Sequence, residues 1–351
     1  MHYRFNSLLL ALFLGTSLYN FALAQEKAKL TLQEIFKNRT FVPESIDVIY
    51  GMIDGQYYTS LISEDQADFI IKYDINTGEA KDTVLNGHTL PKAQSEPVRI
   101  DDYSFNADES QLLLATQKEG IYRRSSKAFY YIYDLESKVL KKLADGEKQS
   151  YATFSPDGSK VAFVRNNNLY YVDLSTMEEY AITTDGKWNH IINGSTDWVY
   201  EEEFSFVRAF DWNSTGTKIA YLRFDETNVP EFTMNVFGQD LYPENETFKY
   251  PKAGEENAKV SLHVYDLSEG EVTDVELGDY EDFYIPRVEW TNDPDILSVQ
   301  VINRHQNDLD LIFVDTENNE VEVVLNETDR AYVDIHDNLT FLDDNSFIWT
   351  S

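Results

Sequence analysis

The chain has 351 residues, with 29 Lys and Arg against 62 Asp and Glu, a formal net charge of −33 and no cysteine. Its length and its 42% hydrophobic residues are sufficient for a large core, which argues against a disordered protein. The acidic charge argues against nucleic-acid binding, which depends on Lys and Arg that neutralise phosphates, and the lack of cysteine excludes disulfides, thiol catalysis and Cys-zinc sites.

The first 24 residues have the pattern of a secretory signal peptide. They contain one basic residue after the start, Arg4, no acid, an apolar run over 8–14 and the small-residue sequence Ala22-Leu23-Ala24. An N-terminal membrane anchor is the alternative, but the run is well short of the roughly 20 apolar residues that a spanning helix needs. We therefore expect residues 1–24 to be removed, no membrane span, and a protein exported to the periplasm, the cell surface or the medium.

Two linked sequence elements recur from residue 73 onward. One is an aromatic or apolar residue followed by a tight polar turn and a strand, as in Phe154-Ser155-Pro156-Asp157-Gly158. The other is an apolar strand that ends in Asp before a polar turn, and its copies lie at steps of 60, 39, 93 and 49 residues: Asp74, Asp134, Asp173, Asp266 and Asp315.

These repeats predict an all-β fold, a β-propeller of four-stranded blades, because radial packing of such units protects strand edges that an open sheet would expose. A β-sandwich is the alternative, and five copies of the linked elements argue against it. At about 50 residues per blade, residues 25–351 would make six to seven blades. The chain stops at Ser351 just after a strand. Either an N-terminal strand closes the last blade or the propeller is incomplete before closure, and we favour the second interpretation.

The 93-residue step between Asp173 and Asp266 is long enough to hold an insertion. Within it, Thr196 or Asp197 can cap a short acidic helix that carries three consecutive carboxylates, Glu201, Glu202 and Glu203. One interpretation is a solvated acidic helix. The other is a cation site, because flanking aromatic residues shield the carboxylates from water and strengthen their attraction for an ammonium group.

Three segments of this region resemble the dipeptidyl peptidase IV family of the prolyl oligopeptidase clan. They are Thr-Asp-Trp-Val-Tyr-Glu-Glu-Glu-Phe at 196–204, Asp-Glu-Thr-Asn-Val-Pro at 225–230 and Tyr-Pro-Lys-Ala-Gly-Glu-Glu-Asn at 250–257. Their order and spacing agree with the family, as do residues 30–36 and 154–158, so that the resemblance covers residues 28–351. It implies an eight-bladed propeller over an α/β-hydrolase domain, which releases X-Pro or X-Ala dipeptides from peptide N-termini with a Ser-Asp-His triad.

The resemblance also implies a substrate site. The last two acids of the Tyr-Glu-Glu-Glu motif hold the free ammonium of the peptide substrate in that family, and they correspond to Glu202 and Glu203. Glu201 points about 100° away from Glu202 on a helix, so we expect its removal to matter much less.

Two more residues follow from the resemblance. An Arg upstream of a Tyr-Asp-Leu strand binds a substrate carbonyl in the family, which corresponds to Arg123, with Arg124 as the alternative. An aromatic residue from a later blade lines the family's pocket, and Tyr332 is the nearest candidate on a looser match.

The sequence lacks the family's catalytic motif. No Gly-x-Ser-x-Gly nucleophile motif and no His-Glu-x-x-His metal motif occurs in it, so we predict no catalytic residue, no metal site and no cofactor in this chain. The expected function is that of the substrate-recognition and gating propeller of a secreted serine exopeptidase whose hydrolase domain is missing in cis. The chain alone would then be inactive. Peptides with a free N-terminus would be its substrates, and a homodimer is compatible with the family. The alternative is a non-catalytic propeller that binds peptides or partner proteins.

Overall fold

The computed structural model describes residues 30–43, 48–64, 66–90, 92–93, 96–97 and 99–351. The predicted signal peptide at residues 1–24 lies outside these ranges. The chain divides into two units, Met1–Val48 and Ile49–Ser351. The described part of the first unit contains a short π-helical turn, η1 (Gln33–Lys37). Within the described ranges, no helix is long and apolar enough to cross a membrane.

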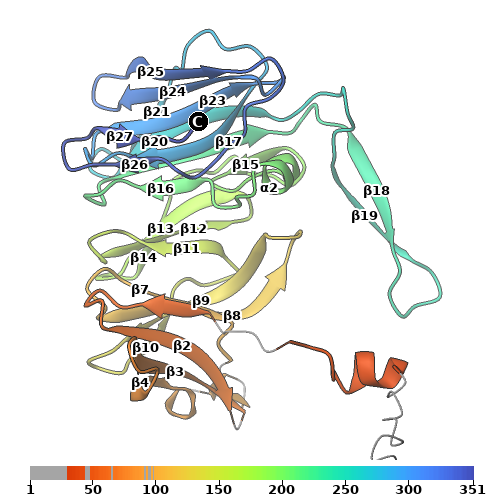
Figure 1. Cartoon of the computed structure of the whole chain (residues 1–351), viewed down its shortest axis with the longest axis vertical. Coiled ribbons are helices and arrows are strands. Elements are labelled where there is room, and N and C mark those ends of the chain that lie inside the picture. The colour runs from red at the N-terminus through yellow and green to blue at the C-terminus, as the bar shows by residue number, and fades with distance from the viewer. Residues whose placement is uncertain (1–29, 44–47, 65, 91, 94–95, 98) are drawn as a thin grey trace, which may run out of the picture. The chain divides into compact units, whose positions relative to one another are not determined.

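Four-stranded antiparallel sheets follow one another along the second unit, and we call each of them a blade (Figure 1). The strands of the first blade are β1 (Ile49–Gly51), β2 (Tyr57–Glu64), β3 (Ala67–Asp74) and β4 (Ala80–Asn86). The second blade consists of β7 (Asp102–Phe105), β8 (Gln111–Gly120), β9 (Ser126–Asp134) and β10 (Leu140–Lys142). The third consists of β11 (Ser150–Phe154), β12 (Lys160–Arg165), β13 (Asn168–Asp173) and β14 (Glu178–Ala181). Between the first two lie η2 (Gly87–Thr89), β5 (Lys92–Ala93) and β6 (Glu96–Pro97).

The fourth blade carries two insertions. Its first strand is split into β15 (Ile191–Asn193) and β16 (Phe210–Trp212), which both pair with β17 (Lys218–Asp225), and helix α2 (Trp198–Glu203) lies in the split. A two-stranded hairpin, β18 (Glu231–Val236) and β19 (Glu244–Lys249), separates β17 from β20 (Lys259–Asp266), and β21 (Glu271–Asp274) completes the blade. The expected acidic helix is therefore present, and it interrupts the first strand of a blade.

The fifth blade repeats the simple pattern, and the described chain ends in a short pair of strands. The fifth blade consists of β22 (Phe283–Trp290), β23 (Ile296–Asn303), β24 (Asp308–Asp315) and β25 (Glu320–Thr328), and the last pair is β26 (Thr340–Phe341) and β27 (Phe347–Ile348). The predicted all-β class with four-stranded antiparallel units is thus confirmed.

Hydrophobic clusters between neighbouring blades form the core. Side chains alternate between the two faces of a strand. In β12, Val161 and Phe163 therefore pack toward the second blade, while Ala162 and Val164 pack toward the fourth. Because both faces are covered, the central strands are continuous apolar runs, unlike strands with one face in water.

The two recurring sequence elements form two sets of turns. The Asp that ends each repeat lies between the third and fourth strands of a blade, and its carboxylate accepts backbone N–H groups two or three residues ahead, at Asp74, Asp134, Asp173, Asp266 and Asp315. The other element forms the turn between the first and second strands.

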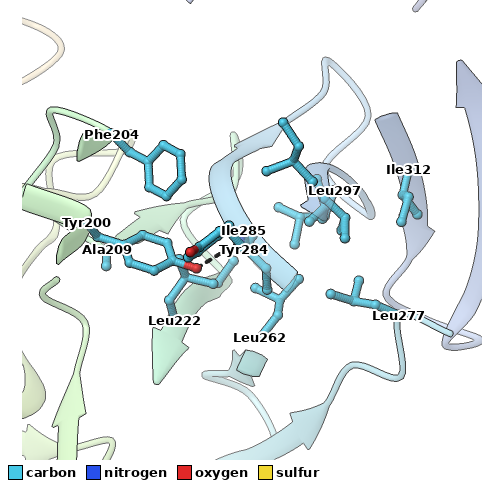
Figure 2. Packing of buried hydrophobic residues seen from close by; sticks show 14 of the residues in the cluster. Tyr200, Phe204, Ala209, Leu222, Leu262, Leu277, Tyr284, Ile285, Leu297 and Ile312 are labelled. Atoms are coloured by element: carbon cyan, nitrogen blue, oxygen red, sulfur yellow. Dashed lines mark hydrogen bonds between the residues drawn. The ribbon is translucent and has the colours of Figure 1, made fainter. Parts of the chain in front are cut away.

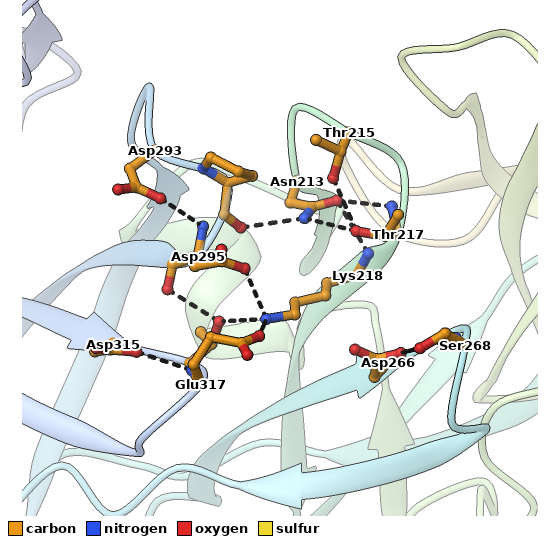
Figure 3. Close-up of polar contacts among 12 residues, drawn as sticks. Asn213, Thr215, Thr217, Lys218, Asp266, Ser268, Asp293, Asp295, Asp315 and Glu317 are labelled. Carbon is orange, nitrogen blue, oxygen red and sulfur yellow. Dashed lines mark hydrogen bonds and ion pairs between the residues drawn. The ribbon is translucent and has the colours of Figure 1, made fainter.

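Neighbouring blades are joined through this second set of turns. In one turn, Asn213 donates its side-chain N–H to the carbonyl of Pro294 in the next blade at 3.1 Å. Beside it, the buried ammonium of Lys218 binds Asp295 at 2.8 Å and also contacts Glu317 (Figure 3). This turn therefore links the fourth blade to the fifth, in addition to reversing the chain.

Candidate functional site

Helix α2 carries the three acids that the sequence singled out. The Asp197 carboxylate caps the helix by accepting the N–H of Tyr200 at 2.8 Å, so Asp197 fills the predicted capping role. Burial raises the pKa of Asp197 to about 7. At the other end, Arg287 donates from Nη1 to the carbonyl of Phe204 at 3.0 Å. A side chain therefore binds a free backbone group at each end of this short helix.

Tyr200 anchors α2 in the core between the fourth and fifth blades (Figure 2). Its ring is buried against Phe204 and Phe224, with centroids 5.0 and 4.7 Å away. Its hydroxyl accepts the N–H of Ile285 at 2.9 Å. Ile285 lies where the register between β22 and β23 shifts, so no ladder partner is available for that N–H. The helix thus supplies the acceptor that the bulge leaves missing.

The three consecutive acids occupy different environments, because each helical residue is rotated by about 100° from the one before. Glu201 is 1% exposed, and its Oε1 accepts the N–H groups of Arg124 at 2.6 Å and Ser125 at 2.9 Å. Glu202 is partly exposed, and its Oε2 lies 3.3 Å from Nε of Arg123. Glu203 is exposed. The structure therefore brings Glu202 and Arg123 together and leaves Glu203 beside them on the helix.

Arg123 lies at the tip of the β8–β9 hairpin of the second blade. The tip is closed by the N–H of Ile121 on the carbonyl of Ser125 at 2.8 Å and by the N–H of Tyr122 on Oγ of Ser125 at 3.0 Å. The Arg123 side chain is 72% exposed. Arg124, the alternative, instead lines a cavity of about 700 Å³ whose other lining residues come mainly from the second and third blades. Of the two arginines, Arg123 is the one that contacts the helix acids through its side chain.

A buried carboxyl lies close to the capping end of α2. Glu226 follows β17 and is buried, and burial together with the nearby Asp197 raises its pKa to about 8, while Lys249 offsets part of the effect. Sequence reasoning missed Glu226 as part of this site. Its place in the segment 225–230, which resembles the family, was the available signal.

The segment at 250–257 also reaches the helix. Trp198 of α2 lies against Tyr250, with ring centroids 4.3 Å apart, and Tyr250 in turn contacts Phe248 of β19. The three segments that carry the family resemblance therefore meet around α2 in space.

Tyr332 makes its hydrogen bonds away from helix α2. It follows β25, is exposed, and its hydroxyl donates to Oε1 of Gln306 at 3.0 Å. Within the described ranges, no hydrogen bond or ring contact joins it to α2. The structure gives no support for Tyr332 as a neighbour of the two acids.

One histidine makes an arrangement that the sequence did not reveal. His263 contacts Oγ of Ser261 through Nε2 and the carboxylate of Asp274 through Nδ1, both at 2.7 Å, in the atom order of a serine-hydrolase triad. The Asp274 side chain is 77% exposed, however, whereas the carboxylate that orients a triad histidine is buried. We therefore assign the row of Ser261, His263 and Asp274 a structural role in the fourth blade. Among the described residues, no group of three or more acids and histidines is placed to hold a metal ion.

Comparisons with known proteins agree with the family resemblance. The model of the family described as "Dipeptidyl peptidase IV (DPP IV) N-terminal region" matches residues 106–351. The chain is 33% identical over 281 residues to a probable dipeptidyl-aminopeptidase B of Emericella nidulans, which covers 74% of this chain and 30% of the relative. It is 32% identical over 304 residues to a probable dipeptidyl peptidase 4 of Aspergillus fumigatus, covering 82% of this chain and 38% of the relative.

Solved structures support the same relationship. The crystal structure of Porphyromonas gingivalis dipeptidyl peptidase 4 superposes with a TM-score of 0.84 at 36% identity, over 91% of this chain and 45% of that one. A putative dipeptidyl aminopeptidase IV of Bacteroides ovatus shares the fold, with a TM-score of 0.64 at 21% identity. The chain spans about a third of the length of the curated relatives it matches.

Proposed function

This chain belongs to the dipeptidyl peptidase IV family through the N-terminal region of that family, and from this premise we propose that it is the substrate-recognition and gating propeller of a secreted serine exopeptidase. The enzyme would release X-Pro or X-Ala dipeptides from peptides with a free N-terminus. Because no nucleophile motif occurs in the sequence, bond cleavage is assigned to an α/β-hydrolase domain of the kind that the resemblance implies.

One observation carries the proposal: the contact between Arg123 and Glu202 beside the exposed Glu203. Two adjacent carboxylates repel each other unless a cation lies between them. In the free protein the Arg123 guanidinium lies against Glu202 and offsets part of the repulsion between the two adjacent carboxylates. A peptide ammonium, which donates three hydrogen bonds, can then bind Glu202 and Glu203 while Arg123 binds a carbonyl of the same peptide.

Kinetics of the full-length gene product test this role. Charge-assisted hydrogen bonds contribute about 1.5–3 kcal/mol each, so Glu202→Ala and Glu203→Ala should each lower kcat/KM for Ala-Pro-p-nitroanilide by roughly 10- to 150-fold. Ser261→Ala is the matched control. Ser261 belongs to the Ser261–His263–Asp274 row, which we assign a structural role, so its replacement should leave turnover unchanged. N-acetylated substrate should be rejected by the wild-type protein.

The outcomes separate the candidate functions. Equal cleavage of acetylated and free substrates would contradict the ammonium site. Specific binding of free Ala-Pro peptides without turnover would favour the alternative, a non-catalytic propeller that binds peptides. Turnover that Ser261→Ala abolishes would show that the His263 row is catalytic.

We also propose a homodimer that involves the β18–β19 hairpin. Strands β18 and β19, seen as a separate hairpin in Figure 1, pair only with each other among the described strands. The loop between them exposes large apolar side chains at Phe237, Leu241 and Tyr242. Exposed apolar clusters of this kind favour association. Charged substitutions at Phe237 and Leu241 should convert a dimer to a monomer in analytical ultracentrifugation, and an unchanged mass would contradict the proposal.

Export is proposed from the pattern of residues 1–24. The mature protein should then begin at Gln25 when recovered from outside the cytoplasm and analysed by N-terminal sequencing. A protein that retains residues 1–24 there would contradict cleavage.

A further inference from the structure

Glu201 joins helix α2 to the hairpin tip that carries Arg123. Its Oε1 accepts the N–H groups of Arg124 and Ser125, which are 77 and 76 residues away in the sequence and belong to another blade. Both contacts are to the main chain. They therefore fix the path of the backbone immediately after Arg123, whatever the Arg123 side chain does.

Apart from the bonds of Glu201, the tip contacts α2 directly only through Arg123 among the described residues, while the ring of Tyr122 packs on Phe248 of β19 with centroids 5.7 Å apart. The bonds from Ile121 and Tyr122 to Ser125 close the tip on itself. The remaining described link to α2 is the ion pair of Arg123 with Glu202, in which the arginine is 72% exposed. Exposed ion pairs contribute little, because water screens the charges and two long side chains lose freedom.

The contacts of Glu201 are stronger than this ion pair. The Glu201 side chain is 1% exposed and accepts two backbone N–H groups at 2.6 and 2.9 Å, so water does not compete for these bonds as it does for an exposed ion pair. The comparison indicates that Glu201, rather than Glu202, determines where the tip lies. It leads to a different prediction from the one made for Glu201 on sequence alone, because the 100° rotation that turns Glu201 from Glu202 directs it to the backbone of the tip.

We propose that Glu201 is a positioning residue for peptide recognition. It holds the backbone of the tip from the buried side of α2, so that the Arg123 guanidinium stays beside Glu202, and it does not touch the peptide. This role rests on the proposed function, in which Arg123 and Glu202 bind the substrate.

Hydrogen exchange of the full-length gene product tests the hold on the tip directly. Glu201→Ala should speed exchange of the amides of Arg124 and Ser125, followed in a peptide covering 121–126, by about 10- to 100-fold. Glu201→Gln should keep most of the protection, because one amide oxygen can accept the same two N–H groups. Asp173→Ala is the matched control: Asp173 accepts two backbone N–H groups in a turn of the third blade, and the loss of its carboxylate should leave 121–126 unaffected.

A double-mutant cycle tests whether Glu201 acts through Arg123. Arg123→Ala is expected to raise KM for Ala-Pro-p-nitroanilide about tenfold, and Glu201→Ala should raise it similarly. In the Arg123→Ala background, Glu201→Ala should then have less than a threefold further effect, since positioning an absent side chain changes nothing. Glu201→Gln should restore KM to within about threefold of the wild-type value.

The possible results distinguish this role from the proposed function. No turnover by the wild-type protein would count against the proposed peptidase activity. The exchange experiment would still test whether Glu201 positions the tip. Unchanged exchange at 121–126 in Glu201→Ala would overturn the positioning role. So would additive effects in the cycle, or a Glu201→Gln protein that keeps a protected tip and yet has the KM of Arg123→Ala.

Discussion

Replacing Tyr200 with Phe should loosen the attachment of α2 without creating a cavity. The substitution removes one oxygen atom and leaves the ring in its place among Phe204 and Phe224. The N–H of Ile285, which is fully buried at a bulge, then has no acceptor. A buried unsatisfied donor costs about 1–3 kcal/mol. Because RT is about 0.59 kcal/mol, this cost corresponds to an increase of about 5- to 150-fold in the population of states in which the Ile285 N–H is exposed to water.

Hydrogen exchange followed by mass spectrometry measures this opening at the Ile285 amide, in a peptide covering 283–287. Tyr284→Phe is a suitable control, because its hydroxyl accepts only a side-chain N–H of Asn257, at 2.7 Å. The reasoning predicts faster exchange in Tyr200→Phe and little change in Tyr284→Phe. Equal exchange in Tyr200→Phe and the wild-type protein would refute it, since the hydroxyl would then contribute nothing to the attachment of the helix.

Three further predictions concern stability, measured as the midpoint of urea-induced unfolding. Replacing Lys218 with Met should lower the midpoint less than replacing Asp295 with Asn and Glu317 with Gln together. The first change leaves two solvated acids without a cation, whereas the second leaves a buried ammonium without its charge partners. An equal loss would contradict this. Gly158→Ala should destabilise more than Gly146→Ala: both have positive φ, but a Cβ at Gly158 would lie 3.0 Å from a side chain of the second blade and one at Gly146 would meet nothing within 4 Å. Equal losses would show that the turn contact is loose. Glu226 has a pKa of about 8 in the folded protein, so the folded state retains a proton that the unfolded state releases, and stability should fall between about pH 5 and pH 8. Glu226→Gln should make this fall shallower, and an unchanged pH profile would contradict the raised pKa.

The sequence predicted the repeating units well because each unit is specified locally. An Asp that accepts N–H groups two or three residues ahead, as Asp173 does, needs no information from the rest of the chain. The same holds for the cap at Asp197, where a short side chain precedes a helix with one acid, Glu201, in its first turn. Such features follow from a few consecutive residues.

The parts of the site that sequence reasoning missed depend on contacts between blades. Nothing near Glu201 in the sequence shows that its carboxylate meets the backbone of a tip more than 70 residues upstream. Likewise the raised pKa of Glu226 depends on burial beside Asp197, which is 29 positions away in the sequence. Helical geometry can indicate that three consecutive acids cannot share one environment, but only packing identifies the buried one.

A crystal structure of the full-length gene product with a bound Ala-Pro dipeptide tests the central claim most directly. The account predicts that the α-ammonium nitrogen lies about 2.7–3.2 Å from carboxylate oxygens of both Glu202 and Glu203, with the Arg123 guanidinium on a carbonyl of the dipeptide. A dipeptide bound with its ammonium away from both acids, or with Arg123 turned away from it, would contradict the account.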